Sequence, residues 1–226
     1  MKHCFKRVLA LCLCIAALVG YIPALPTAVP AVTADLDSLS NEEILRRIRE
    51  AGIVGMGGAT DSTNAIDAPE VAVITNIGLD HTDILGNTLE EIAETKAGIF
   101  KNNGHAVVYR GTKGVEEVFE RVCAERNVSL KKADFDSLVL HSHSLEGQVF
   151  DCGSRKELFL PLLGDHQLHN AAVVLGVIDT LQEKGWNITE EHVREGLRDV
   201  SWPGRFDIMR KDPLFIIDGG HNPQCI

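Results

Sequence analysis

The stretch that decides the fold is Val71-Ala-Val-Ile-Thr-Asn-Ile-Gly-Leu-Asp-His-Thr-Asp-Ile-Leu-Gly. Its first seven residues are apolar or β-branched with one exception, which predicts a strand buried on both faces. The glycine that follows ends the strand and turns the chain outward. Ligands bind at the carboxyl ends of strands in open α/β sheets, so Asp80 and His81 lie where a functional site is expected.

The chain continues Asn-Thr-Leu-Glu-Glu-Ile-Ala-Glu-Thr-Lys96. Thr88 and Glu91 have the spacing of a capping box, which predicts the start of a helix with Lys96 two turns in. Strand, polar loop and capped helix form one unit. Taken on spacing alone, this unit is equally compatible with an ordinary βα turn, in which His81 is a loop residue and Lys96 a solvated lysine that pairs with a nearby glutamate.

The rest of the chain alternates in the same way and predicts an α/β fold with a mostly parallel sheet flanked by helices. An antiparallel hairpin and a final strand are expected after this alternation. The predicted elements are a strand at 106–109, a helix at 115–126, a hairpin of 148–152 with 158–163, helices at 167–184 and 189–200, and a strand at 213–217.

Composition excludes some classes of function. The 226 residues carry a net charge of -10 with a pI near 5.3, which argues against a nucleic-acid partner because phosphate backbones are bound by Lys and Arg. The six cysteines have no C-x-x-C spacing, so neither a zinc site nor a disulfide framework is indicated.

Residues 1–34 have the pattern of a secretory signal peptide, with basic residues before an apolar run and small residues up to Ala34. A single-span anchor is the rival interpretation, but the apolar run is shorter than the roughly 20 residues that a spanning helix needs. Residues 35–54 are predicted to form a polar linker and an amphipathic helix.

Three further segments carry recognisable motifs: Leu160-Pro-Leu-Leu-Gly-Asp-His-Gln-Leu-His-Asn-Ala-Ala172, Trp202-Pro-Gly-Arg205 and Ile217-Asp-Gly-Gly-His-Asn-Pro223. Together with the opening stretch they resemble, in order and spacing, the folylpolyglutamate synthase and dihydrofolate synthase group of the Mur ligase superfamily. The resemblance implies that residues 55–204 form the central ATP-binding domain of such a ligase. Residues 205–226 would begin a second α/β domain, of which only the first strand is expected.

Enzymes of this group use ATP and Mg²⁺ to convert a carboxylate to an acyl phosphate, which the amine of L-glutamate attacks. The resemblance therefore implies folate or dihydropteroate and L-glutamate as partners, with no nucleic acid, and a monomer is expected. It assigns roles residue by residue: a magnesium ligand at His81, catalytic roles for a carbamylated Lys96 and for His221, and ATP contacts at Arg205, Asp218, Asn170, His166 and Gln167.

Each of these residues also has a simpler interpretation. Arg205 is equally suited to a surface ion pair, Asn170 to helix capping, and His221 to a turn before Asn222-Pro223. A carbamate forms only on a neutral lysine, so the proposed role of Lys96 requires a site that lowers its pKa.

Parts of the ligase pattern are missing. The chain has no Gly-Lys dipeptide and hence no G-x-x-x-x-G-K-[ST] loop for the β- and γ-phosphates. Ile53 and Ala59 stand where the group carries a metal-binding glutamate and an arginine. Because preorganised electrostatic groups are each worth on the order of 10² to 10³ in rate, the chain is predicted to be truncated and catalytically inactive or nearly so.

Two other functions stay open. The signal-like start favours an exported binding module without activity, whereas the ligase resemblance favours the cytoplasm. The interpretation as a dinucleotide-dependent oxidoreductase rests on residues 40–60. This stretch resembles the C subunit of the Rnf electron-transport complex and contains Gly55-Met-Gly-Gly58. That glycine run does not match G-x-G-x-x-G.

Overall fold

A computed structural model of the chain describes residues 71–79 and 85–219, which divide between two compact units. One unit contains residues 71–106 and 111–130, apart from the gap at 80–84. The other contains residues 107–110 and 131–219. The expected segments 1–34 and 35–54 lie outside the described residues, as do the Rnf-like stretch, Ile53 and Ala59.

The first unit contains β1 (Ala72–Ile74), α5 (Leu89–Lys96), the 3-10 turn η2 (Ala97–Ile99), the start of β2 (His105–Val108) and α6 (Lys113–Glu125). The capping box is confirmed. The Thr88 hydroxyl accepts the Glu91 N–H at 3.1 Å, and the Glu91 carboxylate accepts the Thr88 N–H at 3.3 Å. The opening strand is shorter than the apolar run predicts.

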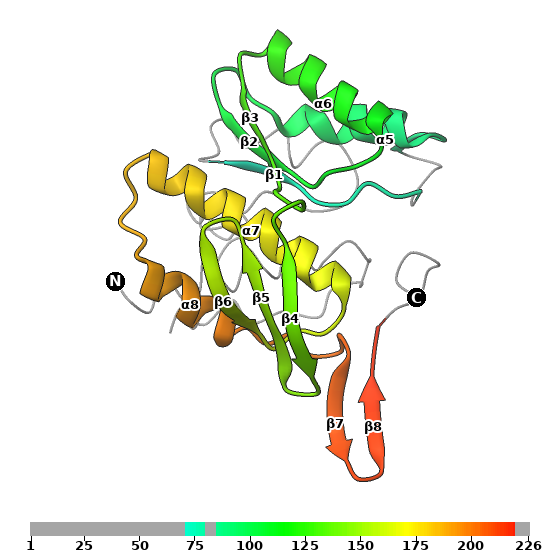
Figure 1. Ribbon diagram of the computed structural model, residues 1–226. Helices are drawn as coiled ribbons and strands as arrows, with labels where there is room; N and C mark the ends of the chain where they lie inside the picture. The colour runs from blue at the N-terminus through cyan, green and yellow to red at the C-terminus, as the bar shows by residue number, and fades with distance from the viewer. Residues whose placement is uncertain (1–70, 80–84, 220–226) are drawn as a thin grey trace, which may run out of the picture. The chain divides into compact units, whose positions relative to one another are not determined.

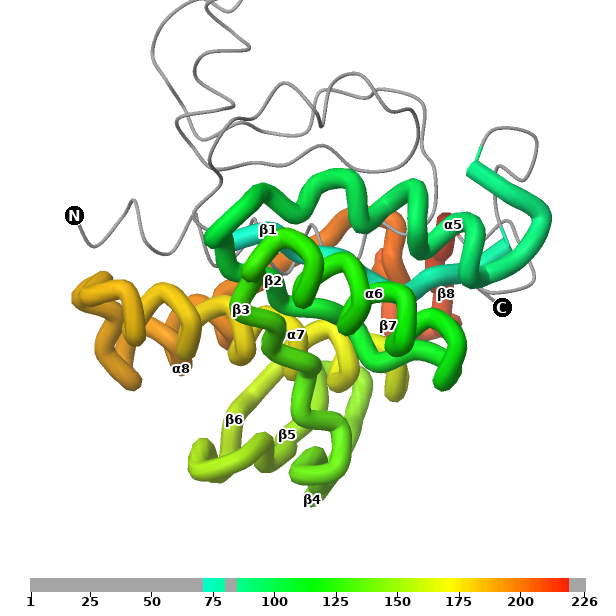
Figure 2. The backbone as a smooth tube through the Cα atoms, turned by 90° about the horizontal axis from the view of Figure 1, so that it is seen from above, coloured from blue at the N-terminus to red at the C-terminus, as the bar shows by residue number. Residues whose placement is uncertain are grey.

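Helices α5 and α6 lie side by side (Figure 2). The buried face of α6 has helical spacing and consists of Val115, Phe119, Val122 and Cys123. Phe119 meets Phe100 edge to face with 5.9 Å between ring centroids, and both rings are fully buried. Such a pair contributes about 0.5–1.5 kcal/mol beyond the burial of its area.

Strands β1, β2 and β3 (Ser129–Lys132) form one sheet in that order. The Ser129 N–H donates to the Gly104 carbonyl and the Ala133 N–H to the Val108 carbonyl. Since both partners advance by four residues in the same direction, β2 and β3 are parallel. The predicted α/β fold with a parallel sheet is therefore confirmed.

The second unit adds an antiparallel sheet of β4 (Val139–Ser144), β5 (Gly147–Cys152) and β6 (Arg155–Leu160). Strands β5 and β6 are the predicted hairpin. The edge strand β4 was not predicted, because all six of its residues are exposed and it lacks an apolar face. Two bulges interrupt the ladders, one at His141 and one opposite Asp151.

Helix α7 (Asp165–Glu183) runs across this sheet (Figure 1). Thirteen of its 19 residues are buried, and the apolar run 171–178 is buried throughout. A short loop leads to α8 (Glu190–Arg198), whose N-cap Thr189 forms a capping box with His192. None of the helices within residues 71–79 and 85–219 is long and apolar enough to cross a membrane.

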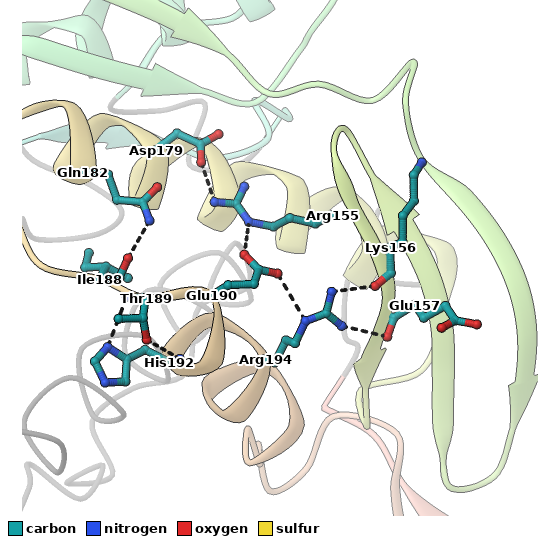
Figure 3. Close-up of polar contacts among 10 residues, drawn as sticks. All are labelled: Arg155, Lys156, Glu157, Asp179, Gln182, Ile188, Thr189, Glu190, His192 and Arg194. Atoms are coloured by element: carbon teal, nitrogen blue, oxygen red, sulfur yellow. Dashed lines mark hydrogen bonds and ion pairs between the residues drawn. The ribbon is translucent and has the colours of Figure 1, made fainter.

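Arg155 connects three of these elements (Figure 3). From β6, its guanidinium contacts Asp179 of α7 at 2.7 Å and Glu190 of α8 at 3.1 Å, and the arginine side chain is only 14% exposed. Arg194 of α8 extends the network by donating to the carbonyl oxygens of Lys156 and Glu157.

The described chain ends in an antiparallel hairpin of β7 (Asp207–Lys211) and β8 (Leu214–Ile217). Strand β8 is the predicted final strand. Its partner β7 was not predicted, because Asp207-Ile-Met-Arg-Lys has only two apolar residues. Lys211 forms an ion pair of 2.6 Å with Glu146, which follows β4.

Candidate functional site

The Trp-Pro-Gly-Arg motif is a tight turn. The Arg205 N–H donates to the Trp202 carbonyl, and Gly204 has a φ of 76°. Proline at the second position and a glycine with positive φ at the third are the pattern of a type II turn. The sequence therefore fixes locally where Arg205 leaves the backbone.

The Asp-Gly loop after β8 is bound to this turn. One oxygen of Asp218 accepts the Phe206 N–H at 2.7 Å, and the Gly219 N–H donates to the Gly204 carbonyl at 2.8 Å. Two motifs that lie more than ten residues apart in the sequence are thus joined at the base of the β7–β8 hairpin.

Helix α7 begins at a glycine with a specific steric role. Gly164 has a φ of 102°, and a Cβ placed there would lie 2.7 Å from the His166 ring. Any other residue would therefore be strained and would push the imidazole away. Gly164 provides no side-chain cap; its carbonyl accepts the Gln167 N–H at 3.0 Å, and the amide groups before Gln167 point out of the start of the helix.

His166 brings the three motifs together. Partial loss of hydration lowers the pKa of its imidazole, the Asp218 carboxylate raises that pKa, and the Arg205 guanidinium lowers it. Weaker influences come from Asp165 and His169. The charges of Arg205 and Asp218 both act on the His166 imidazole, so the three residues that the sequence assigned to ATP lie within electrostatic range of one another.

Gln167 and Asn170 are also in the first two turns of α7, but both are buried. The Asn170 amide donates to the Gln167 side-chain oxygen at 3.2 Å. Asn170 lies inside the helix and is not its cap, so the simple capping interpretation is wrong.

Lys96 is the last residue of α5 and is half-buried. Of the two glutamates considered as its partners, Glu94 forms an ion pair with Arg121 and Glu91 accepts backbone N–H groups at the start of α5. His81 and His221 lie outside the described residues. Within residues 71–79 and 85–219, no three His, Cys, Asp or Glu side chains are grouped closely enough to hold a metal ion.

Sequence reasoning missed an aromatic cluster beside His166. Tyr109 follows β2, Phe135 follows β3, and His169 lies one turn into α7. The signal that could have found it is the placement of an aromatic residue just beyond each of two neighbouring parallel strands. The cluster is bordered by an ion pair of 2.6 Å between Arg110 and Asp136.

The chemistry of the site suits an anion. A guanidinium, an imidazole and the amino end of a 19-residue helix are all donors, and the helix dipole favours negative charge at that end. Asp165 and Asp218 add two carboxylates, which attract the hydroxyl groups or the cation that accompany a phosphate ester.

Comparison with known proteins places this arrangement in a family. Residues 26–178 match the Mur ligase middle domain. The chain is 37% identical over 183 residues to the dihydrofolate synthase/folylpolyglutamate synthase of Mycobacterium tuberculosis, a match that covers 75% of this chain and 37% of that protein. The chain thus spans less than half the length of the curated relatives it matches.

Solved structures of folylpolyglutamate synthases are similar to this chain as well. The M. tuberculosis folylpolyglutamate synthase complexed with ADP superimposes with a TM-score of 0.66 at 36% identity, over 76% of this chain and 40% of that one. A folylpolyglutamate synthase complex with AMPPCP and folate gives a TM-score of 0.68 at 31% identity, over 76% of this chain and 43% of that one.

Proposed function

Because the chain belongs to the Mur ligase family through its middle domain, we propose that it is the nucleotide-binding part of a ligase that joins L-glutamate to folate or dihydropteroate with ATP. The observation that carries this proposal is the convergence of His166, Arg205 and Asp218 at the amino end of α7. ADP and AMPPCP are bound by the related synthases.

In this proposal the phosphates of ATP lie before the first turn of α7. The guanidinium of Arg205 neutralises their charge, and His166 adds an N–H donor. Asp218 accepts a ribose hydroxyl while its Oδ2 fixes the turn that carries Arg205. The site thereby orients the nucleotide so that its terminal phosphate faces the carboxylate of the acceptor.

The remaining assigned residues serve the chemical step. We propose that Lys96, once carbamylated, and His81 hold the Mg²⁺ that ATP brings, and that His221 lies near the acyl phosphate. Gln167 and Asn170 would act through the packing of the first turns of α7.

We further propose that this chain binds nucleotide but ligates poorly by itself. The missing Gly-Lys loop and the replacements at Ile53 and Ala59 remove groups that hold the β- and γ-phosphates and the metal. The ligase assignment favours the cytoplasm as its location, and we keep the boundary between a central domain at 55–204 and a second domain from 205 as part of the proposal.

The test is to titrate the full chain with AMPPCP and Mg²⁺ by calorimetry, and then to measure ADP release with folate or dihydropteroate and L-glutamate. We expect binding that Arg205→Met weakens at least tenfold, with ADP release near background. An absence of binding would reject the nucleotide site, and rapid glutamate-dependent ADP release would reject the predicted inactivity. Phe159→Leu, a change on β6, is the control variant.

A further inference from the structure

The turn before β2 contains the only Asn-Gly dipeptide in the sequence, at Asn103 and Gly104. The Gly104 N–H donates to the Lys101 carbonyl at 3.1 Å, and Asn103 has a φ of 58°. A positive φ at the third position of a four-residue turn is the pattern of a type II turn, which glycine and asparagine adopt most easily. A Cβ on Gly104 would lie 2.9 Å from the Lys101 carbonyl oxygen. The turn therefore favours asparagine or glycine at 103 and leaves no room for a side chain at 104.

This pair of residues is chemically reactive. The backbone nitrogen of the residue that follows an asparagine can add to the side-chain amide carbon of that asparagine. Glycine hinders this attack least, because it has no side chain and its backbone is the most adaptable. Asparagine is among the thermolabile residues of proteins. Asn103 is exposed and Gly104 is partly exposed, so solvent reaches the reacting atoms.

Hydrogen bonds from the end of α6 hold the turn in place. Nδ2 of Asn127 donates to Oδ1 of Asn103 at 2.7 Å, and the Asn103 N–H donates to the Arg126 carbonyl at 2.9 Å. Asn127 is itself fixed, with a φ of 52° and an N–H that donates to the Ala124 carbonyl at 3.3 Å. The carboxamide that would react is thus bound by a second carboxamide, and the attacking nitrogen is engaged by its hydrogen bond to Lys101.

We propose that Asn103 is a modification site at which the chain converts its own asparagine to aspartate and isoaspartate, and that Asn127 restrains the reaction. The Gly104 nitrogen loses its proton and forms a bond to Cγ of Asn103, while the Cγ–Nδ2 bond breaks and ammonia leaves with that proton. Water then opens the cyclic imide. Addition of water at Cγ gives aspartate, and addition at the main-chain carbonyl gives isoaspartate. Nothing is oxidised or reduced, and solvent water is the co-reactant.

The two products differ in their effect on the fold. Aspartate at 103 keeps the backbone unchanged, and its carboxylate accepts from Asn127 as the amide oxygen does. Isoaspartate passes the main chain through its side chain and lengthens it by one atom before Gly104. This displaces the Gly104 carbonyl, which accepts the Ser129 N–H at 3.0 Å and begins the ladder between β2 and β3. We therefore expect isoaspartate, but not aspartate, to loosen the start of β2.

The test follows the conversion in the full chain at pH 8 by mass spectrometry after digestion. Trypsin releases residues 102–110 as one peptide, in which Asn102 is followed by asparagine instead of glycine and is the internal control. Asn127→Ala is the test variant, and Asn87→Ala is the matched control because Asn87 is exposed in the same unit. We expect Asn103 to convert about fivefold faster in Asn127→Ala, the factor that one hydrogen bond of ordinary net strength represents. The control variant should convert at the rate of the unmodified chain.

Other results would overturn the proposal. Equal conversion of Asn102 and Asn103 would show that the turn and its glycine confer no selectivity. Slower conversion in Asn127→Ala would show that Asn127 promotes the reaction and does not restrain it. The full chain unfolded in guanidinium chloride supplies a comparison that needs no variant. Asn103 should convert faster there than in the folded chain, and equal rates in the two states would contradict restraint by the fold.

Discussion

The backbone N–H of Glu157 donates a hydrogen bond of 2.9 Å to the carboxylate of Asp151 on the neighbouring strand. A side chain thus replaces a ladder carbonyl at the bulge between β5 and β6, where Glu157 has a φ of 51°. The same carboxylate contacts His141 at 2.8 Å and Lys156 at 3.2 Å. The charge of Asp151 therefore stabilises the bulge and offsets the strain of its backbone.

Replacing Glu157 by glycine should stabilise the protein. A left-handed conformation costs a non-glycine residue roughly 1–2 kcal/mol, and the exposed Glu157 side chain accounts for little of the packing. We expect Glu157→Gly to raise the free energy of unfolding by about 1 kcal/mol in urea denaturation. Glu157→Ala, which keeps the strain, should change it by less than about 0.5 kcal/mol. Equal effects of the two variants would contradict this account.

The Asp151 carboxylate should make the stability depend on pH in a defined range. Its hydrogen bond from the Glu157 N–H lowers the pKa of Asp151 to about 2, and His141 and Lys156 lower it further against the opposing effect of desolvation. Because the pKa is lower in the folded state, the stabilisation is complete above the unfolded value and is lost as pH falls from about 4 to about 2.

Asp151→Asn keeps an oxygen that can accept from Glu157 but cannot be protonated in this range. The melting temperature of the variant should be lower than that of the unmodified chain at pH 6, and the difference should shrink as pH falls toward 2. A difference that stays constant between pH 6 and pH 2 would show that the Asp151 charge is not responsible.

Arg155 is predicted to stabilise the second unit more than Arg194 does. Arg155→Met keeps the aliphatic part of the side chain but leaves Asp179 and Glu190 without their shared guanidinium. These carboxylates are 41% and 47% exposed and can regain water, so we expect a loss of about 2 kcal/mol. Arg194→Met, on a more exposed arginine, should cost about 1 kcal/mol or less in the same urea titration.

Anion binding at the amino end of α7 should strengthen as pH falls. The pKa of His166 is lowered, chiefly by partial desolvation, which favours the neutral imidazole. A bound anion favours the charged form, and each unit by which it raises that pKa adds about tenfold in affinity at low pH. Sulfate is a suitable probe because its own charge is constant from pH 5 to 8.

His166→Gln should remove this pH dependence while it leaves a hydrogen-bond donor in place. Calorimetric titrations with sulfate at pH 5.5 and 7.5 provide the comparison. If the sulfate affinities of the variant at pH 5.5 and pH 7.5 differed as much as those of the unmodified chain, another group would be responsible for the pH dependence.

Much of the fold could be predicted because its signals are local. The capping box of Thr88 and Glu91, the helical spacing of α6 and the hairpin of β5 and β6 each depend on residues within one or two turns. Strands β3, β4 and β7 escaped prediction because none of them has an alternating apolar face. The bulge at Glu157 depends on a backbone hydrogen bond to the Asp151 carboxylate, six residues earlier, which residue types and spacing alone do not reveal.

The candidate site also contains residues that the sequence could predict and residues that it could not. Motif resemblance identified His166, Arg205 and Asp218, but no spacing rule could show that they meet, since hydrogen bonds between the turn at Gly204 and the loop at Gly219 bring them together. The aromatic cluster was missed because single aromatic residues after strands are common. Only the three-dimensional contact of Tyr109, Phe135 and His169 distinguishes them.

The burial of the apolar middle of α7 has a consequence for how the chain acquires its structure. A helix with a middle that is apolar on every side is not stable until its neighbours are in place, and residues 165–183 leave the ribosome before α8 does. During that interval the nascent chain exposes an apolar segment that is prone to aggregation and that molecular chaperones can bind. The yield of folded protein on expression should therefore depend on chaperone supply and on the pace of translation just beyond the codon for Glu183.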